Sequence, residues 1–456
     1  MVKNAEIVSS QGRQKGHLLV RQGKVFARLA PGPVPEGLQA QEVIDAQGMM
    51  VFPGMVDLHV HIGEPGKEEK EDLSTGTRAA AAGGVTTIAI MPNSVPPVHS
   101  ATSLRDRAGL IHRKSFVDFC MLGGAGGESV DDIVAQAEAG AVGYKSYVGA
   151  YRPDRPGLLC KDTADMLKTL EEVAKTDCFV GFHCEDGPTM RLLQERLVAQ
   201  GRTDFAAYHP SRPEFTESLA TLPLLEVARV TGARLYLVHM SSPWAITLAS
   251  WWREQGTDVT IETCPHYLLF NEKDTERLGP YAQVAPPLRS IATQQALWDL
   301  VNDGTLDVIA TDHAPGTPAE KKRGQTNIFA GGGGLPALET VWLTLLDAVK
   351  RHKTTAENLA WLMAEHPARI ARIYPQKGHL EVGADADMIL VNPDATTRFD
   401  AEKMYTKNKD AAKIFHGMEV GAKLEMVLQR GQVIAKDLEV TREQPLGAQW
   451  VKPHPR

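Results

Sequence analysis

The sequence predicts an α/β protein whose central part is a (β/α)8 TIM-like barrel, joined to a small composite β-sandwich domain built from both ends of the chain. Three observations lead to this prediction. Apolar runs rich in Val and Ile alternate with amphipathic segments in the middle of the chain, short β-type segments occupy both ends, and reactive side chains follow the apolar runs at their carboxyl ends.

Both ends of the chain carry short apolar segments separated by glycine and proline, a pattern typical of β-strands. These segments are 17–30, 42–54, 385–393 and 424–437. Because the two ends resemble each other more than the middle, we expect residues 1–50 and 377–440 to form one β-sandwich domain. Residues 51–376 then form the barrel and residues 441–456 a C-terminal tail.

The middle of the chain alternates between strand-like and helix-like segments. Examples of the apolar runs are 86–92, 116–124, 140–148, 178–186, 233–242, 257–266 and 305–315. Amphipathic segments such as 214–232 and 293–304 lie between them. Strands that are apolar throughout and alternate with helices indicate a parallel sheet covered on its faces. Eight such units fit a (β/α)8 barrel, and a doubly wound sheet is the alternative.

Polar side chains at the carboxyl ends of these runs favour the barrel. They are His59, His61, Lys145, His183, His239 and Asp312. In a barrel, the carboxyl ends of all strands meet at one rim, where active sites lie. A doubly wound sheet gathers its ligands mainly at one switch point and does not need a reactive group after each strand.

The histidines and the aspartate suggest a metal site. His59 and His61 are two residues apart, so on a strand both imidazoles point to the same face. Alone, such a pair is more often two hydrogen-bonded polar residues in a loop. With His183, His239 and Asp312 at other strand ends, nitrogen and carboxylate ligands become available together. They suit zinc, while manganese, cobalt and iron remain possible.

Lys145 is the unusual member of the group, since it ends an apolar strand. A buried ammonium is unfavourable, so the side chain either extends to solvent or pairs with a carboxylate. The alternative is a neutral amine carboxylated by carbon dioxide. Burial favours the neutral amine, and the resulting carbamate is an anionic ligand that can bridge two metal ions.

The bulk composition excludes several other classes. The 456 residues are 43% hydrophobic and 23% charged, which is typical of a soluble globular protein. The net charge of −7 argues against a nucleic-acid partner. Five scattered cysteines form no CxxC pair, and no apolar run has the length of a membrane span. A cytoplasmic protein without membrane contact is therefore expected.

The glycine-rich segment 331–340 is not a phosphate-binding loop. It lacks the Gly-Lys-Ser/Thr ending, and no strand leads into it. We expect it to be a loop beside the active site. The charged segment 66–72 is expected to be a solvated loop or the start of a helix.

Several motifs together resemble the cyclic amidohydrolases of the amidohydrolase superfamily, a group that includes allantoinases, hydantoinases, dihydropyrimidinases and dihydroorotases. The motifs are VDLHVHIGEPG, TGTRAAAAGGVTT, GYKSY, GFHCED, LVHMSS, ETCPHYLL and IATDHAP. The resemblance covers nearly the whole chain. It also includes the ending KGHLEVGADADMILVNP, which is similar to the return of the family's chain into its β-sandwich.

The resemblance implies a binuclear metal centre, with two divalent ions per subunit. His59, His61 and Asp312 match ligands of the more buried ion, whereas His183 and His239 match ligands of the more exposed ion. Lys145 matches the bridging carboxylated lysine, and Asp312 also matches the catalytic general base. The implied reaction is hydrolysis of a cyclic amide by a bridging hydroxide, with Asp312 passing a proton to the leaving ring nitrogen.

The substrate is less sharply defined than the reaction. Dihydroorotases carry a carboxylate-binding arginine where this chain has Gly63, and an asparagine where it has Ala285. An arginine is the natural partner of a substrate carboxylate, so its absence argues against dihydroorotate. Asn93 does match a substrate asparagine of dihydroorotases. Arg152 could also replace the missing arginine.

Other segments resemble hydantoinases and allantoinases most closely, which places an allantoin- or hydantoin-type ring first, dihydropyrimidine second and dihydroorotate third. Backbone groups near Ala285 and Gly333 are expected to bind ring amides, and Tyr147 and Tyr151 to shape the pocket. The resemblance also implies a homodimer or homotetramer.

Two rival classes remain. A non-catalytic structural relative would lack metal ligands, yet all matched ligands are present. A mononuclear deaminase or deacetylase would not need Lys145.

Overall fold

A parallel sheet of successive strands forms the centre of the computed structural model, which describes residues 1–35, 37–149 and 157–455. The strands follow the order β6 (Met55–Val60), β7 (Val85–Ile90), β8 (Asp118–Gly124), β9 (Ala141–Val148), β11 (Phe179–His183), β12 (Arg234–Val238), β13 (Val259–Thr263) and β14 (Val308–Ile309). A parallel bridge between Val60 and His313 joins the two ends of the sheet. The predicted (β/α)8 fold class is confirmed.

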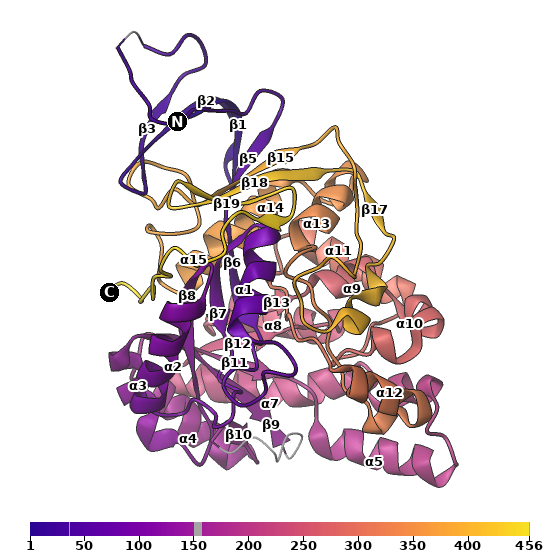
Figure 1. The fold of residues 1–456 in the computed structure, drawn as a ribbon. Helices are drawn as coiled ribbons and strands as arrows, with labels where there is room; N and C mark the ends of the chain where they lie inside the picture. Colours follow the sequence, from indigo (N-terminus) through magenta and orange to yellow (C-terminus); the bar gives the residue numbers. More distant parts are fainter. Residues whose placement is uncertain (36, 150–156, 456) are drawn as a thin grey trace.

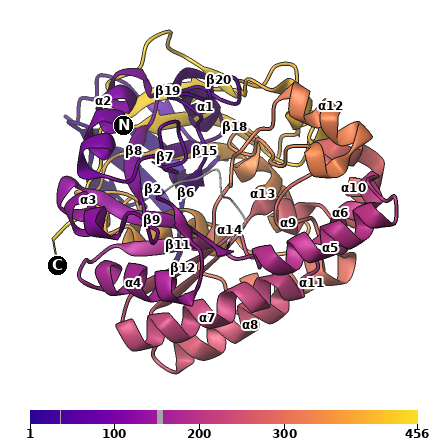
Figure 2. The same ribbon diagram turned by 90° about the horizontal axis from the view of Figure 1, so that it is seen from below.

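Helices follow the strands and cover the outside of this sheet (Figures 1 and 2). The main ones are α1 (Leu73–Ala82), α2 (Ala101–Lys114), α3 (Ile133–Ala139), α4 (Thr163–Ala174), α5 (Gly187–Ala199), α7 (Phe215–Thr231), α8 (Pro243–Glu254), α11 (Ile291–Asn302) and α13 (Val341–Lys350). Several begin at an Asp or Ser whose side chain accepts a backbone N–H of the first turn, as Asp72, Asp186 and Ser242 do. Such caps stop the preceding loop and start the helix.

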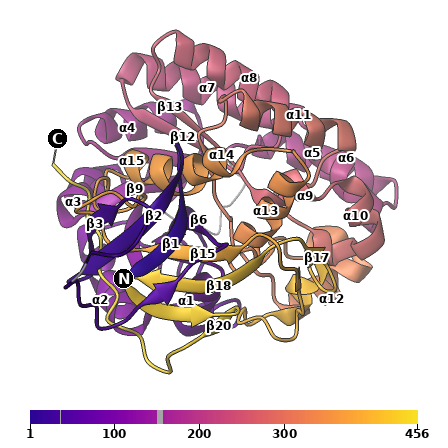
Figure 3. The ribbon, with the colours of Figure 1, turned by 90° about the horizontal axis from the view of Figure 1, so that it is seen from above.

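The two ends of the chain build a second, mixed sheet. Its order is β20 (Glu439–Val440), β19 (Gln432–Lys436), β18 (Lys423–Gln429), β15 (Met388–Asn392), β5 (Met50–Pro53), β1 (Val2–Ser9), β2 (Gly12–Arg21) and β3 (Lys24–Leu29), with β4 (Ile44–Asp45) beside β1. Figure 3 shows the indigo N-terminal strands next to the yellow C-terminal ones. The strand-rich region built from both termini is thereby confirmed, whereas the domain boundaries stay a prediction.

A buried ion cluster attaches the terminal sheet to the barrel. The Lys377 ammonium contacts carboxylates of Asp118, Asp385 and Asp387 at 2.7, 3.0 and 2.7 Å. Asp118 is the first residue of β8, so this junction lies at the amino end of a barrel strand. The carboxyl ends, where the reactive side chains were expected, are left to form a site.

Shorter elements fill the connections. They are β10 (Leu159–Cys160), α6 (Tyr208–Ser211), α9 (Pro265–Leu269), α10 (Glu272–Leu278), α12 (Pro318–Thr326), α14 (Ala356–Ala360), α15 (His366–Ile370), β16 (Thr397–Arg398) and β17 (Glu419–Val420), together with short 3-10 turns and a π-helical turn at Trp361–Glu365. The run 305–315 was expected to be one strand, but β14 covers only two of its residues. The chain leaves the ladder before Asp312, whose φ of 45° is incompatible with a strand.

Candidate metal centre and active site

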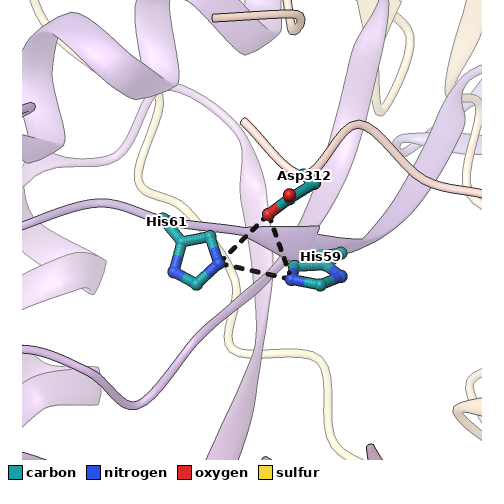
Figure 4. A group of neighbouring side chains, drawn as sticks. All are labelled: His59, His61 and Asp312. Carbon is teal, nitrogen blue, oxygen red and sulfur yellow. Dashed lines mark hydrogen bonds and ion pairs between the residues drawn. The ribbon is translucent and has the colours of Figure 1, made fainter. Parts of the chain in front are cut away.

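His59, His61 and Asp312 converge on one point at the carboxyl end of the barrel (Figure 4). The Nε2 atoms of His59 and His61 lie 3.2 Å apart. Each of these nitrogens lies 3.2 Å from Asp312 Oδ1. The three ligand atoms thus form a nearly equilateral triangle, although His59 and Asp312 are far apart in the sequence.

This triangle has the dimensions of a metal site. Zinc binds imidazole nitrogen and carboxylate oxygen at roughly 2.0–2.2 Å in tetrahedral geometry, which separates neighbouring ligand atoms by about 3.3 Å. Two nitrogen lone pairs and a carboxylate oxygen that point at one another would repel without a cation or a shared proton. The donor set therefore fits a divalent metal ion.

His183 and His239 form a second pair of ring nitrogens. His183 Nδ1 lies 2.9 Å from His239 Nε2. The ring of His239 is also 5.3 Å from that of His59, centroid to centroid, so the pair adjoins the first triangle. Burial lowers the pKa of His183 to about 4 and that of His239 well below its usual value. Both rings are therefore neutral at pH 7, the form that binds metals.

Lys145 lies in the same region, from the neighbouring strand β9. Its side chain is 1% exposed, and Nζ is 5.1 Å from the centroid of the Tyr147 ring. Five of the six residues that the sequence predicted as ligands line one cavity: His61, Lys145, His183, His239 and Asp312. The sixth, His59, adjoins the cavity through its contacts with His61 and Asp312.

Two of these residues have unusual backbone conformations. Asp312 has φ 45° and His239 has φ 43°, in the left-handed region that non-glycine residues rarely adopt. Such a conformation costs on the order of 1 kcal/mol and persists only where surrounding contacts enforce it. At both positions the turn aims a reactive side chain into the cavity. The pKa of Asp312 is held well below its ordinary value, because His59 and His61 outweigh the opposing effect of burial.

Buried carboxylates that sequence reasoning missed orient these histidines. Glu262 Oε1 lies 2.8 Å from His59 Nδ1, and Glu185 Oε2 lies 2.9 Å from His183 Nε2. Glu185 is fully buried, yet Arg212 and His183 bring its pKa to about 2. Both residues belong to motifs quoted above, Glu185 to GFHCED and Glu262 to ETCPHYLL, but a glutamate there carries no signal of which histidine it contacts.

The cavity measures about 440 Å³ and is lined by most of the predicted substrate residues: Gly63, Asn93, Tyr147, Ala285 and Gly333. Tyr151 and Arg152 lie outside the described residues. Lining groups that the sequence did not suggest include Lys67, Gln194, Tyr208 and Phe329. Tyr208 donates a hydrogen bond to the Val284 carbonyl at 2.9 Å, which supports the segment before Ala285.

Asn93 has a contact that the sequence did not suggest. Its amide nitrogen Nδ2 lies 2.8 Å from His61 Nδ1, and a turn of the amide plane would exchange this nitrogen for the amide oxygen. If His61 binds a cation through Nε2, its Nδ1 carries a proton, and Asn93 would then present the amide oxygen to it. Asn93 can accordingly orient a metal ligand while it also lines the cavity.

Gly63, which stands where dihydroorotases carry an arginine, lies in a tightly packed loop. A Cβ atom at this position would lie 2.1 Å from the Lys67 carbonyl oxygen. The Gly63 carbonyl in turn accepts the Lys67 N–H at 3.0 Å, and the Gly63 N–H donates to the Glu71 carbonyl at 2.8 Å. The loop thus folds tightly over Gly63, and no arginine fits there without rearrangement of this loop.

Known proteins with similar sequences place the chain in a family. A model of the amidohydrolase family matches residues 50–434. The chain belongs to the amidohydrolase family. It is 35% identical to an allantoinase of Bacillus velezensis over 96% of this chain and 94% of that protein. It is also 34% identical to an L-hydantoinase of Paenarthrobacter aurescens over 98% and 96%.

Solved structures of this amidohydrolase fold agree with the sequence relatives. An L-hydantoinase (dihydropyrimidinase) from Arthrobacter aurescens superposes with a TM-score of 0.94 at 33% identity, covering 99% of both chains. A D-hydantoinase (dihydropyrimidinase) from Thermus sp. gives a TM-score of 0.89 at 26% identity, covering 99% of this chain and 98% of that one. Among the residues described, no helix has the length and apolar composition needed to cross a membrane.

Proposed function

We propose that this amidohydrolase opens a small cyclic amide or ureide ring by hydrolysis, with two divalent metal ions, zinc by preference, and a carboxylated Lys145 between them. The observation that carries the proposal is the 3.2 Å triangle of His59, His61 and Asp312 beside the His183–His239 pair and a buried lysine. When bound, such ions acidify water and polarise an amide carbonyl.

The residues of the chain supply the other functions. His59 and His61 would hold one ion with Asp312, while His183 and His239 would hold the other. The Asp312 carboxylate, kept ionised by its histidine neighbours, accepts a proton during attack on the carbonyl and passes it to the departing ring nitrogen. A neutral Lys145 amine, favoured by burial, is the form that carbon dioxide carboxylates.

A five-membered ureide ring of the allantoin or hydantoin type is the favoured substrate. Support comes from full-length relatives named allantoinase and L-hydantoinase at 35% and 34% identity. The tightly packed loop at Gly63 has no room for the arginine that a carboxylate-bearing ring would require. Arg212, which lines the cavity, is already paired with Glu185. Dihydropyrimidine ranks second and dihydroorotate third.

A panel of rings tests this proposal. The purified protein is loaded with zinc and assayed against allantoin, hydantoin, dihydrouracil, dihydroorotate and a cyclic imide, and kcat/KM is measured for each. We expect the highest value for allantoin or hydantoin, with removal of metal by a chelator abolishing the activity and added zinc restoring it. A clear preference for dihydroorotate would contradict the substrate assignment, and activity that survives full metal depletion would contradict the metal chemistry.

We further propose that the protein is a homo-oligomer, at least a dimer. Helices α7 and α8 lie side by side on the outside of the barrel (Figure 2). Together they expose large apolar side chains: Leu219, Leu222, Val230, Trp244 and Trp251, at 46, 39, 59, 63 and 54%. The spacing along each helix puts these side chains on one face. A cluster of exposed apolar side chains on neighbouring helices is typical of a protein–protein interface, and a second copy of the chain is the simplest partner.

A further inference from the structure

Glu262 occupies a position between the two candidate metal-ligand groups. It lies on β13 (Val259–Thr263), one residue before the end of the strand, and its side chain is fully buried. We propose that Glu262 is a positioning residue that holds one ligand of each metal ion at once, and so couples the binding of the two ions. This inference rests on the binuclear function proposed above and deepens it.

The contacts of the carboxylate are short and use both oxygens. Oε1 lies 2.8 Å from His59 Nδ1 and accepts the backbone N–H of His239 at 2.7 Å. Oε2 accepts the Tyr236 hydroxyl at 2.7 Å. A single oxygen atom therefore touches residues from two different strands, β6 and the end of β12. With three donors converging on it, the carboxylate acts as an acceptor only and is itself no candidate ligand.

The contact with His59 selects which ring nitrogen faces the metal. When Nδ1 carries the proton and donates to Glu262, Nε2 is left with its lone pair. That Nε2 is the atom that lies 3.2 Å from both His61 Nε2 and Asp312 Oδ1. A carboxylate behind an imidazole also makes it a stronger base and therefore a better metal ligand.

The contact with His239 acts through the backbone instead. His239 has φ 43°, a conformation that needs external support. Glu262 supports this turn from two sides, because its side chain accepts the His239 N–H and its main-chain carbonyl accepts the Met240 N–H at 2.8 Å. This turn directs the His239 ring towards His183. Loss of the carboxylate should thus disturb the second metal ion as well as the first.

The other carboxylate near the histidines lacks this double role. Glu185 contacts the ring of His183 and the guanidinium of Arg212, and both of these residues lie outside the group of His59, His61 and Asp312. Glu185 therefore serves as the comparison for a residue that acts on one ligand group. Tyr236 serves as the control, because its hydroxyl contacts Glu262 Oε2 without touching either histidine contact.

The test measures metal binding rather than turnover. Wild type, Glu262→Ala, Glu262→Gln, Glu185→Gln and Tyr236→Phe are stripped of metal and titrated with zinc against a chromophoric chelator, and bound ions are counted after dialysis. Folding is checked by circular dichroism. Since Glu262→Gln has nearly the same shape, it remains informative if the alanine variant does not fold.

We expect Glu262→Ala to weaken both ions by about 10- to 100-fold, the usual effect of losing such a partner, and Glu262→Gln to weaken both by about 10-fold. Glu185→Gln should weaken one ion only, and Tyr236→Phe should bind two ions like wild type. Wild-type affinity for both ions in the Glu262 variants, or loss of one ion with the other intact, would overturn the inference. Wild-type protein that binds no ion would instead overturn the proposed metal chemistry itself.

Discussion

At the scale of single residues, burial determines what the reactive groups can do. Lys145 is 1% exposed and His183 is 5% exposed, so neither keeps its charge easily. A neutral imidazole is a ready metal ligand, and a neutral amine is a ready partner for carbon dioxide. Burial thus disfavours the charged forms of these side chains and favours the neutral forms, which are suitable for a metal centre.

Replacement of Lys145 by alanine tests its proposed role. Lys145→Ala should retain fewer than two metal ions per chain and lose activity by a factor on the order of 100 or more, since a direct ligand should matter at least as much as a supporting contact. Short carboxylic acids such as acetate or propionate should restore part of the activity by replacing the carbamate. Lys161→Ala, which changes an exposed lysine paired with Glu128, is the matched control.

Wild-type metal content and activity in Lys145→Ala would contradict the bridging role. The carbamate itself can be sought by carbon-13 NMR after incubation with labelled bicarbonate. A signal present in wild type and absent from the Lys145 variant is expected.

At the scale of elements, two segments far apart in sequence form the rim of the cavity. Helix α12 contributes Glu320, which pairs with Lys70 of the loop after β6 at 2.7 Å. The next residue, Lys321, is buried and donates to the Gly334 carbonyl at 3.3 Å. One short helix thereby holds both the charged loop and the glycine-rich loop that line the site.

The charged segment 66–72 shows why the contacts of these loops could not be predicted from the sequence. It was expected to be solvated, and Asp72 does begin α1 as its N-cap. Glu71, however, is fully buried and accepts hydrogen bonds from the Thr406 hydroxyl at 2.6 Å and the Lys407 N–H at 3.0 Å. Thr406 and Lys407 lie more than 300 residues further along the chain, and no local sequence pattern predicts their contacts with Glu71.

Lys321 makes the stability of this rim depend on pH. Burial lowers the pKa of Lys321 to about 7, with a small opposing effect of Glu320. Between that value and the ordinary lysine pKa of about 10.4 the unfolded chain binds more protons than the folded one, so the free energy of unfolding rises with pH in this window. The unfavourable contribution is complete below pH 7 and absent above about pH 10.4.

The variant Lys321→Met should therefore be more stable than wild type at pH 6, by a few kcal/mol at most, and the difference should shrink towards pH 10. Urea unfolding at pH 6, 8 and 10 measures it. Lys322→Met changes the exposed neighbour and should show no such trend. A stability difference that is constant across this range would contradict the assignment.

At the scale of the whole molecule, the terminal sheet and the site occupy opposite ends of the barrel. The Lys377 cluster joins the terminal sheet to the amino end of β8, whereas His59, His183 and His239 lie at or just after the carboxyl ends of their strands. The attachment that stabilises the molecule therefore does not compete with the substrate for the same rim.

The apolar face of α7 and α8 leads to a prediction at this scale. The double variant Trp244→Glu, Trp251→Glu should sediment as a monomer in analytical ultracentrifugation, while wild type sediments as a dimer or larger assembly, because buried charges without partners oppose association. Val382→Glu changes an exposed apolar residue outside these helices and should keep the wild-type assembly. A monomeric wild type, or an unchanged double variant, would contradict the proposed interface.

The sequence by itself determined the fold class and the chemical character of the site. Alternating apolar strands and amphipathic helices specify a parallel barrel because each pattern is local, and ligand-type residues at the carboxyl ends of several strands follow from the same local order. Only the tertiary structure decided how these residues meet. The nitrogen that each histidine presents, the Lys67 carbonyl packed against Gly63 and the link from Glu262 to His59 and His239 all depend on distances between segments far apart in the chain. Packing of the whole barrel sets these distances, and the sequence of any single segment carries no information about that packing.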